Sequence, residues 1–300
     1  ASGHAASAFG NDSLALGDYS VALGSSAYAG SQNGIAIGKS AYVASTGIGG
    51  YSAHYAAVPT QGIAIGANAS VTGVEGTALG VSATASNLYT TALGTNSTAS
   101  GESSTAVGVN AQATNRFDNA LGFNAQATGE LSNAFGTNAY ASGSRSTAVG
   151  QQATATEAMS TAVGASAFAA EGFSTAIGAF SFALGPESTT RGAYAMAWGH
   201  YSTAIGYSSS ASNVGSTAVG FAASSYGYLS TALGTGAVAR GAYSIAAGLG
   251  AYTGYYAQNE TALGTNASAL GYASTAVGSN ATARGDSSIA VGNTSLASGD

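Results

Sequence analysis

Glycine recurs every 14 residues along most of this chain. A short phrase consisting of a small residue, Ala, a large apolar residue and Gly ends on these glycines, as in Thr77–Gly80 and Thr105–Gly108. The frame glycines are Gly10, Gly24, Gly38, Gly66, Gly80, Gly94, Gly108, Gly122, Gly136, Gly150, Gly164, Gly178, Gly192, Gly206, Gly220, Gly234, Gly248, Gly264, Gly278 and Gly292. A fixed repeat of this length predicts a solenoid in which each repeat forms one turn.

Each repeat contains a second, weaker phrase seven residues after the first, for example Ala125–Gly129 and Ala267–Gly271. Two short extended segments separated by Gly, Asn or Ser predict two strands in each turn. Helices are excluded, because glycine lowers helix stability by about 1 kcal/mol and the runs between glycines are far shorter than the roughly 12 residues a helix needs. The expected fold class is an all-β parallel solenoid.

Side-chain alternation along the strands assigns the two faces. The alanines at the centre of each phrase, such as Ala78 and Ala92, are expected to fill a narrow interior that admits nothing larger. The large apolar residues of the same strands then point out of the solenoid and predict an interface with other copies of the chain, since an exposed apolar stripe of this length favours association. The predicted interface residues are Leu79, Leu93, Val107, Leu121, Phe135, Val149, Val163 and Ile177.

The frame predicts a single domain over residues 1–300 with two irregular segments. Between Gly38 and Gly66 the length still fits two turns, but the phrase is lost over residues 46–62. A two-residue insertion falls at residues 249–260, near Tyr252, Tyr255 and Tyr256. Both segments are expected to form projecting loops, which either carry binding function or cover an irregularity of the solenoid.

Composition excludes several classes of protein. Only 6% of the residues are charged, Lys39 is the single lysine, and the arginines are scattered, which argues against nucleic-acid binding. There is no cysteine, and no apolar run approaches the roughly 20 residues of a spanning helix. His4, His54 and His200 are isolated, and no nucleophile elbow or phosphate loop is present. We therefore expect no catalysis, metal or cofactor.

The phrases at Ser104–Ala113 and Ser274–Ala283 resemble the head repeats of trimeric autotransporter adhesins of the YadA type, and the resemblance extends over nearly the whole chain. It implies a left-handed parallel β-roll, assembled as a parallel homotrimer and displayed extracellularly on a Gram-negative bacterium. Such heads bind host matrix proteins, cells, abiotic surfaces or one another. The neck, stalk and C-terminal membrane anchor of the family are absent after Asp300, so contact with the membrane is expected only through that missing anchor.

One residue breaks the apolar stripe. In the repeat that ends at Gly192, Thr190 takes the Ala position and Arg191 takes the large apolar position. In a trimer three Arg191 side chains would converge near the axis, which is unfavourable without partners. A bound anion or Glu187 of the same or a neighbouring chain would supply them, and the alternative is that Arg191 turns outward to solvent.

The outward positions of the second strand are mostly Gln, Thr and Ser, but three consecutive repeats carry large apolar residues there. Stacked turns would merge these into one exposed patch, which predicts either a ligand contact or packing against a neighbouring subunit. The patch consists of Phe168, Phe180, Phe182, Leu184, Tyr194, Met196 and Trp198.

The sequence therefore favours a non-catalytic surface adhesin head. Two alternatives use the same repeat: a purely structural solenoid, and an ice-binding solenoid built on the column Thr77, Thr91 and Thr105. A solenoid acyltransferase is disfavoured, because its six-residue period and catalytic histidine are missing.

Overall fold

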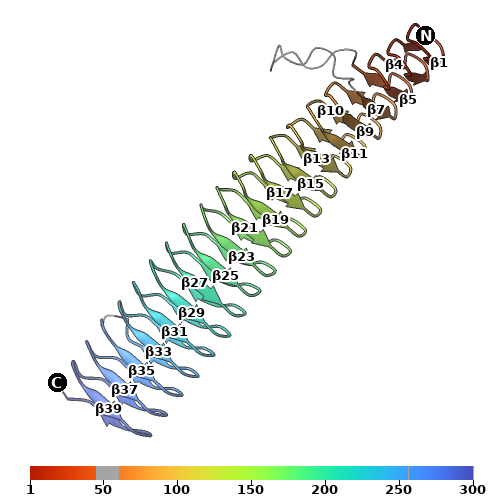
Figure 1. The fold of residues 1–300 in the computed structure, drawn as a ribbon. Coiled ribbons are helices and arrows are strands. Elements are labelled where there is room, and N and C mark those ends of the chain that lie inside the picture. Colours follow the sequence, from red (N-terminus) through yellow and green to blue (C-terminus); the bar gives the residue numbers. More distant parts are fainter. Residues whose placement is uncertain (45–60, 256, 300) are drawn as a thin grey trace, which may run out of the picture. The chain divides into compact units, whose positions relative to one another are not determined.

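The computed structural model describes residues 1–44, 61–255 and 257–299. Two compact units, Ala1–Gln152 and Ala153–Asp300, divide the chain, and each is described by itself. In each unit the chain coils through successive turns, and every turn contributes one strand to each of two parallel sheets, here called sheet A and sheet B (Figure 1). The predicted all-β parallel solenoid with two strands per turn is confirmed. Among the described residues no helix is long and apolar enough to span a membrane.

The first unit contains strands β1 to β19. Sheet A consists of β1 (Ser7–Phe9), β3 (Val21–Leu23), β5 (Ile35–Ile37), β7 (Gly62–Ile65), β9 (Gly76–Leu79), β11 (Thr91–Leu93), β13 (Thr105–Val107), β15 (Asn119–Leu121), β17 (Asn133–Phe135) and β19 (Thr147–Val149). Sheet B consists of β2 (Leu14–Ala15), β4 (Tyr28–Ala29), β6 (Tyr42–Val43), β8 (Ser70–Val71), β10 (Thr84–Ala85), β12 (Thr98–Ala99), β14 (Gln112–Ala113), β16 (Gln126–Ala127) and β18 (Tyr140–Ala141).

The second unit contains strands β20 to β40. Sheet A consists of β21 (Thr161–Val163), β23 (Thr175–Ile177), β25 (Thr189–Arg191), β27 (Thr203–Ile205), β29 (Thr217–Val219), β31 (Thr231–Leu233), β33 (Ile245–Ala247), β35 (Thr261–Leu263), β37 (Thr275–Val277) and β39 (Ile289–Val291). Sheet B consists of β20 (Thr154–Ala155), β22 (Phe168–Ala169), β24 (Phe182–Ala183), β26 (Met196–Ala197), β28 (Ser210–Ala211), β30 (Ser224–Ser225), β32 (Val238–Ala239), β34 (Tyr252–Thr253), β36 (Ser268–Ala269), β38 (Thr282–Ala283) and β40 (Leu296–Ala297).

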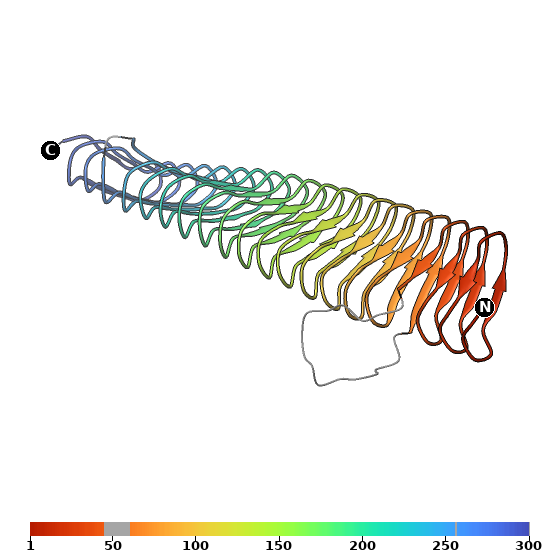
Figure 2. The ribbon, with the colours of Figure 1, turned by 90° about the horizontal axis from the view of Figure 1, so that it is seen from above.

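Equivalent residues of neighbouring turns lie side by side, as the repeat requires. Strand β13 pairs with β15 so that Ala106 lies beside Ala120, and β14 pairs with β16 so that Ala113 lies beside Ala127. Figure 2 shows the successive coils of each unit in sequence order. This in-register stacking lines up identical positions into columns, so that one residue type at one position produces a continuous surface.

Alanine and serine columns fill the space between the sheets. Ala106 of sheet A and Ala113 of sheet B are fully buried, as the alternation predicted. Serine also lies inside, where it satisfies the backbone of the turns: Ser97 donates to the Gly94 carbonyl at 2.8 Å and Ser202 to the Gly199 carbonyl at 2.6 Å. A short hydroxyl thus closes the turn without a cost for burying a polar group.

The expectation that nothing larger than alanine fits inside is wrong at two turns. Val43 and Val71 occupy the alanine column of sheet B and are almost fully buried. The space comes from glycine in the facing column: a Cβ on Gly62 would lie 2.7 Å from Cγ1 of Val43, and one on Gly76 would lie 2.7 Å from Cγ1 of Val71. The interior therefore conserves total volume across a turn.

Residues 38–66 form one turn of the stack, and the prediction of two turns is wrong. Strand β5 pairs directly with β7, with Ile37 beside Ile65, and β6 pairs with β8. The chain between Ala44 and Gln61 therefore contributes no strand to the described sheets. The residues first expected to shape a loop here, Ile48–Tyr51, His54, Tyr55 and Pro59, lie outside the described residues.

The insertion at 249–260 lies after β34. Val238 of β32 is paired with Tyr252 at the usual spacing, whereas Tyr252 is paired with Ser268 and Ala242 with Gln258, each 16 residues apart. The two additional residues are therefore accommodated between Thr253 and Ala257, as the frame predicted, and the stack resumes without a change of register. Tyr256 lies outside the described residues.

Candidate functional site

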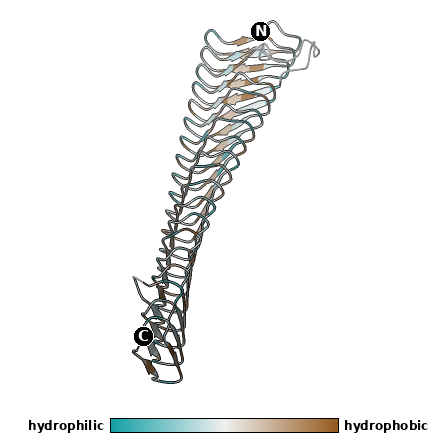
Figure 3. Ribbon diagram, turned by 90° about the vertical axis from the view of Figure 1, so that its left-hand side faces the viewer, coloured by the Kyte–Doolittle hydropathy of each residue, from teal (hydrophilic) through white to brown (hydrophobic). Residues whose placement is uncertain are grey.

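The predicted interface residues form apolar columns on the outer face of sheet A. In the first unit Leu79, Leu93, Val107, Leu121, Phe135 and Val149 lie in register on successive strands, and in the second unit Val163 lies beside Ile177. Leu79, Leu121 and Ile177 are 39–45% exposed. Figure 3 shows brown, hydrophobic segments on the strands of sheet A, whereas the turns carry hydrophilic colours. The structure thus presents each column to the outside of its unit.

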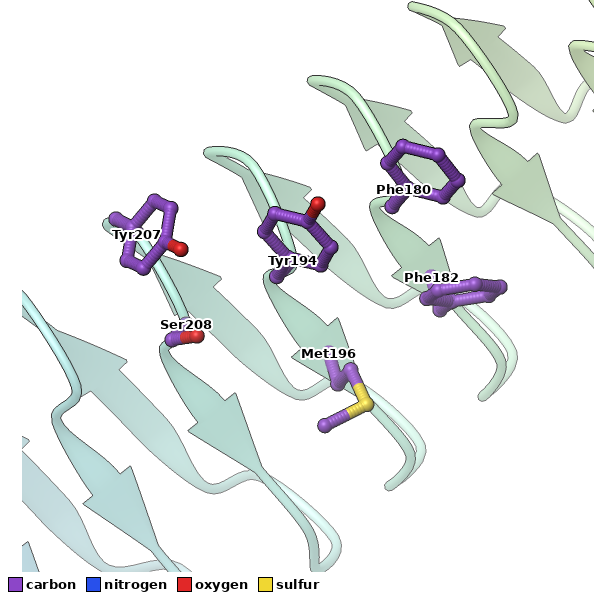
Figure 4. Close-up of a pocket in the computed structure, with 6 residues that line it drawn as sticks. All are labelled: Phe180, Phe182, Tyr194, Met196, Tyr207 and Ser208. Carbon is purple, nitrogen blue, oxygen red and sulfur yellow. The ribbon is translucent and has the colours of Figure 1, made fainter.

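An aromatic surface lies on the second unit, over the turns that lead from sheet A to sheet B. Figure 4 shows that its side chains come from three successive turns and project on the same side. They border an open cavity of about 330 Å³. The lining residues, which we call the aromatic surface, are Phe180, Phe182, Tyr194, Met196, Tyr207 and Ser208.

Four rings stack along the edge of this surface. The rings of Phe180 and Tyr194 are nearly parallel with centroids 5.3 Å apart, Tyr194 meets Tyr207 edge to face at 5.6 Å, and Tyr207 stacks on Phe221 at 5.4 Å. Each of the four side chains is 43–57% exposed. Aromatic pairs in these geometries stabilise each other beyond their burial. The ladder is consequently a firm apolar edge that remains open to solvent.

Local backbone geometry explains how Phe180 and Tyr194 reach this edge. Both residues have positive φ, 53° and 58°, two residues after a frame glycine. The same turn position carries Ser166 and Ser208, also with positive φ, and asparagine in several other turns. This backbone direction lifts the side chain away from the interior, so the position tolerates many residue types.

The predicted patch is only partly gathered together. Phe180, Phe182, Tyr194 and Met196 border the cavity, and Phe168 is aligned with Phe182 in the column that continues to Met196. Leu184 and the 54%-exposed Trp198 follow the strands of sheet B and are not part of the lining.

Sequence reasoning did not include Tyr207 and Phe221. Both lie directly after a frame glycine, one residue before the position of Phe180 and Tyr194, and that offset hid them from a search along strand positions. Aligning the turn residues of all repeats would have revealed four aromatics in four successive turns.

Arg191 lies on the outer face of sheet A, as the frame predicted. It is exposed on β25, with Ile177 and Ile205 as its register neighbours. Thr190 is fully buried in the alanine column, and its hydroxyl lies 3.5 Å from the carbonyl of Thr175. Within the described ranges the one ion pair joins Arg116 to Glu102, at 3.3 Å, so Arg191 does not pair with Glu187 of its own chain.

Two acidic residues lie in the buried serine column, and sequence reasoning did not single them out. Asp118 is fully buried and accepts hydrogen bonds from the Asn115 amide at 2.7 Å and from the Ser132 amide and hydroxyl at 2.9 and 3.0 Å. Glu260 is also fully buried, yet neither carboxyl oxygen has a hydrogen-bond partner. Burial raises the pKa of both carboxyl groups. Comparison of each repeat at this position, where Ser or Thr is usual, would have identified both.

Glu260 provides a pH-dependent test of the interior. Because its folded-state pKa is raised, the ionised form opposes folding, and stability falls as the pH rises from about 4.5 through the raised pKa. We expect Glu260→Gln to increase the free energy of unfolding at pH 8 by at least about 1 kcal/mol, and the gain to vanish near pH 4. Denaturant unfolding at several pH values measures this.

Asp118→Asn is the matched control, because the same column and burial are combined with three accepted hydrogen bonds. Its gain should be smaller than that of Glu260→Gln or negative, since an amide cannot accept all three bonds. Equal gains in the two variants would show that the missing partners of Glu260 are not the cause.

The described residues contain no cluster of His, Asp or Glu able to hold a metal ion. The threonine column considered for ice binding lies on the outer face of sheet A, where Thr77, Thr91 and Thr105 are in register. The next two rungs are Asn119 and Asn133, which are hydrogen-bonded to each other at 3.0 Å. The column is therefore not a uniform threonine array.

Comparison with known families gives a clear match. The model described as the YadA head domain repeat matches residues 1–27, 15–41, 60–80, 72–97, 99–117, 127–153, 155–181, 199–223, 225–251, 261–281 and 283–300, which is well over half of the chain. Among solved structures, the crystal structure of the collagen-binding domain of Yersinia adhesin YadA is similar at 20% identity, over 58% of this chain and 66% of that one, with a TM-score of 0.17. No curated protein matches the chain.

Proposed function

The chain belongs to the YadA head repeat family of non-catalytic adhesin domains displayed on Gram-negative bacteria, and we propose that it forms the parallel homotrimeric head of such an adhesin. In this assembly three left-handed rolls turn sheet A towards a common axis. Sheet B and the turns face outward and carry the adhesive surface. The head remains one domain over residues 1–300.

The apolar columns of sheet A are the observation that carries the trimer. Each unit exposes its column over successive strands, and few soluble monomers expose apolar surface of such extent. Burial of each Leu, Val, Ile or Phe side chain stabilises the assembly by about 1.5–3 kcal/mol. Since all strands within a column point the same way, parallel in-register chains bring equivalent residues together at every rung.

Sedimentation equilibrium at micromolar concentration tests the assembly directly. The expected mass is three times the 28.7 kDa of one chain. A single species of monomer mass, stable over a wide range of concentration, would contradict the trimer and with it the proposed head.

The aromatic surface is the proposed adhesive contact. Its lining combines exposed aromatic rings, Met196 and the hydroxyl groups of Tyr194, Tyr207 and Ser208, without any charged residue. Aromatic residues dominate the energetics of protein contacts, and hydroxyl groups at their rim add orientation. We assign it to extracellular-matrix protein ligands, with cell surfaces, abiotic surfaces and sister heads as the other members of a binding panel.

Removal of the aromatic surface should weaken adhesion. The variant Phe180→Ser/Phe182→Thr/Tyr194→Ser/Met196→Ser uses residues already found at equivalent positions, namely Ser208, Thr154 and Ser210. We expect binding to its matrix ligand to fall at least about ten-fold, because truncation of interface aromatics often costs more than 1 kcal/mol each. Surface plasmon resonance on immobilised matrix proteins and attachment assays on cells and plastic provide the measurement.

The matched control is Tyr28→Thr/Tyr42→Thr in the first unit. These two tyrosines stack at 5.1 Å on adjacent strands of sheet B and resemble the aromatic surface in chemistry, but they lie on a separate unit. Binding should be unchanged in the control. If adhesion of the four-residue variant to every member of the panel equals that of the wild type, the aromatic surface is structural.

A further inference from the structure

Arg191 interrupts the apolar column of the second unit at a single rung. The other described members of this column are uncharged, namely Val163, Ile177, Ile205, Val219, Leu233, Ala247, Leu263, Val277 and Val291. The pairing of β25 with β23 and β27 keeps the standard register, with Thr189 beside Thr175 and Thr203. Arg191 is thus fixed on the outer face of sheet A by regular strands on both sides.

The surroundings of Arg191 supply donors but no negative charge. Thr189 lies on the same face of β25, and Thr175 and Thr203 occupy the equivalent positions of the two neighbouring strands. Glu187 is exposed in the turn before β25 and makes no ion pair with Arg191 within the described part of the chain. A guanidinium group has five N–H donors and no acceptor, so this rung lacks an acceptor that matches it.

We propose that the three Arg191 side chains of the trimer, together with the Thr189 hydroxyl groups, bind one tetrahedral oxyanion of the sulfate or phosphate class on the three-fold axis. This inference rests on the proposed trimer. A tetrahedral oxyanion has its own three-fold axis, which places one oxygen along the axis and one oxygen towards each chain. Guanidinium groups bind such oxygens with strong, charge-assisted hydrogen bonds.

Charge balance provides the physical reason. Three like charges on an apolar face repel one another, and an apolar environment screens this repulsion poorly. A divalent anion at their centre replaces the repulsion with attraction and satisfies donors that the apolar rungs above and below cannot. The anion therefore binds the assembled trimer and not the separated chain, and it stabilises the assembly by mass action.

The test uses the intact trimer in chloride buffer free of sulfate and phosphate. Sedimentation equilibrium first establishes the mass. Equilibrium dialysis against radiolabelled sulfate at constant ionic strength then gives the stoichiometry, and circular dichroism gives Tm as a function of sulfate. We expect one sulfate per three chains and a saturable rise in Tm of about 2–4 °C.

Three variants separate this site from general salt effects. Arg191→Ile, which repeats its neighbours Ile177 and Ile205, should form a trimer that binds no sulfate and follows only the unspecific stabilisation that sulfate gives to most proteins. Arg284→Gln removes an exposed arginine after β38 and should behave as the wild type. Glu187→Gln should retain sulfate binding.

The outcomes are distinct. A wild-type monomer overturns the proposed trimer itself. A trimer without one bound sulfate per three chains, or with equal sulfate dependence in Arg191→Ile, overturns the oxyanion site. A trimer that binds no sulfate and is destabilised by Glu187→Gln also overturns it and assigns Arg191 to an ion pair with a neighbouring chain.

Discussion

Placing aspartate on three successive rungs of the apolar column should convert the trimer to monomers. The variant Leu93→Asp/Val107→Asp/Leu121→Asp alters residues that lie in register on β11, β13 and β15. Each chain loses the burial of three side chains, worth about 1.5–3 kcal/mol apiece, and nine carboxylates would face one another at the axis. Sedimentation equilibrium at micromolar concentration should show at least a hundred-fold rise in the fraction of monomer.

The same three rungs offer a control of equal charge. Thr98→Asp/Gln112→Asp/Gln126→Asp places three aspartates in register on the outer face of sheet B, on β12, β14 and β16. Repulsion within the chain is comparable in the two variants, but these side chains face away from the proposed axis. A trimer that survives the first variant, or one that dissociates equally in both, would contradict an interface along sheet A.

Gly234→Ala should destabilise the solenoid more than other single methyl additions. Gly234 has φ of 127°, and a Cβ there would lie 2.6 Å from the carbonyl oxygen of Gly248 in the next turn. The alanine would therefore combine a strained backbone with a backbone clash, and we expect a loss of at least about 3 kcal/mol in the free energy of unfolding. Thermal and denaturant unfolding followed by circular dichroism provide the measurement.

Gly236→Asn, two residues later, is the corresponding neutral substitution. Gly236 has φ of 63°, and a Cβ there would meet nothing within 4 Å. Asparagine occupies the same turn position at Asn110, Asn124 and Asn138 with φ near 55°. A change within about 0.5 kcal/mol is expected. A similar loss in both variants would mean that close stacking of the frame glycines is not what requires glycine.

The repeat made the fold predictable because each residue type has one physical task at each position. Frame glycines permit a turn that L-residues resist, alanine fits between two close sheets, and large apolar residues are left for the outer face of sheet A. With the period known, strand positions and register followed, and β13 pairs with β15 as the frame requires.

Departures from the repeat were harder to predict, since they depend on contacts between repeats. Val43 and Val71 fit because glycine faces them, a relation visible only when the turns are stacked. The segment between Gly38 and Gly66 has the length of two turns, and only the pairing of β5 with β7 identifies it as one. The burial of Asp118 and Glu260 likewise follows from their column.

The aromatic surface lies between these cases. Strand alternation identified Phe182 and Met196, but Tyr207 and Phe221 project from turns in which side-chain direction depends on φ. The ring contacts that join Phe180, Tyr194 and Tyr207 run between turns, so no single repeat contains them.

The pairing of β5 with β7 has a consequence for how such a chain can change during evolution. Backbone hydrogen bonds run from each turn to the next, as from the Gly66 amide to the Ile37 carbonyl, and the partners need not be 14 residues apart in sequence. Recombination between neighbouring repeats would remove or add whole 14-residue blocks and leave every remaining rung with an equivalent partner. Gene segments of this kind can therefore lengthen or shorten by units of 14 codons while the encoded stack keeps its register.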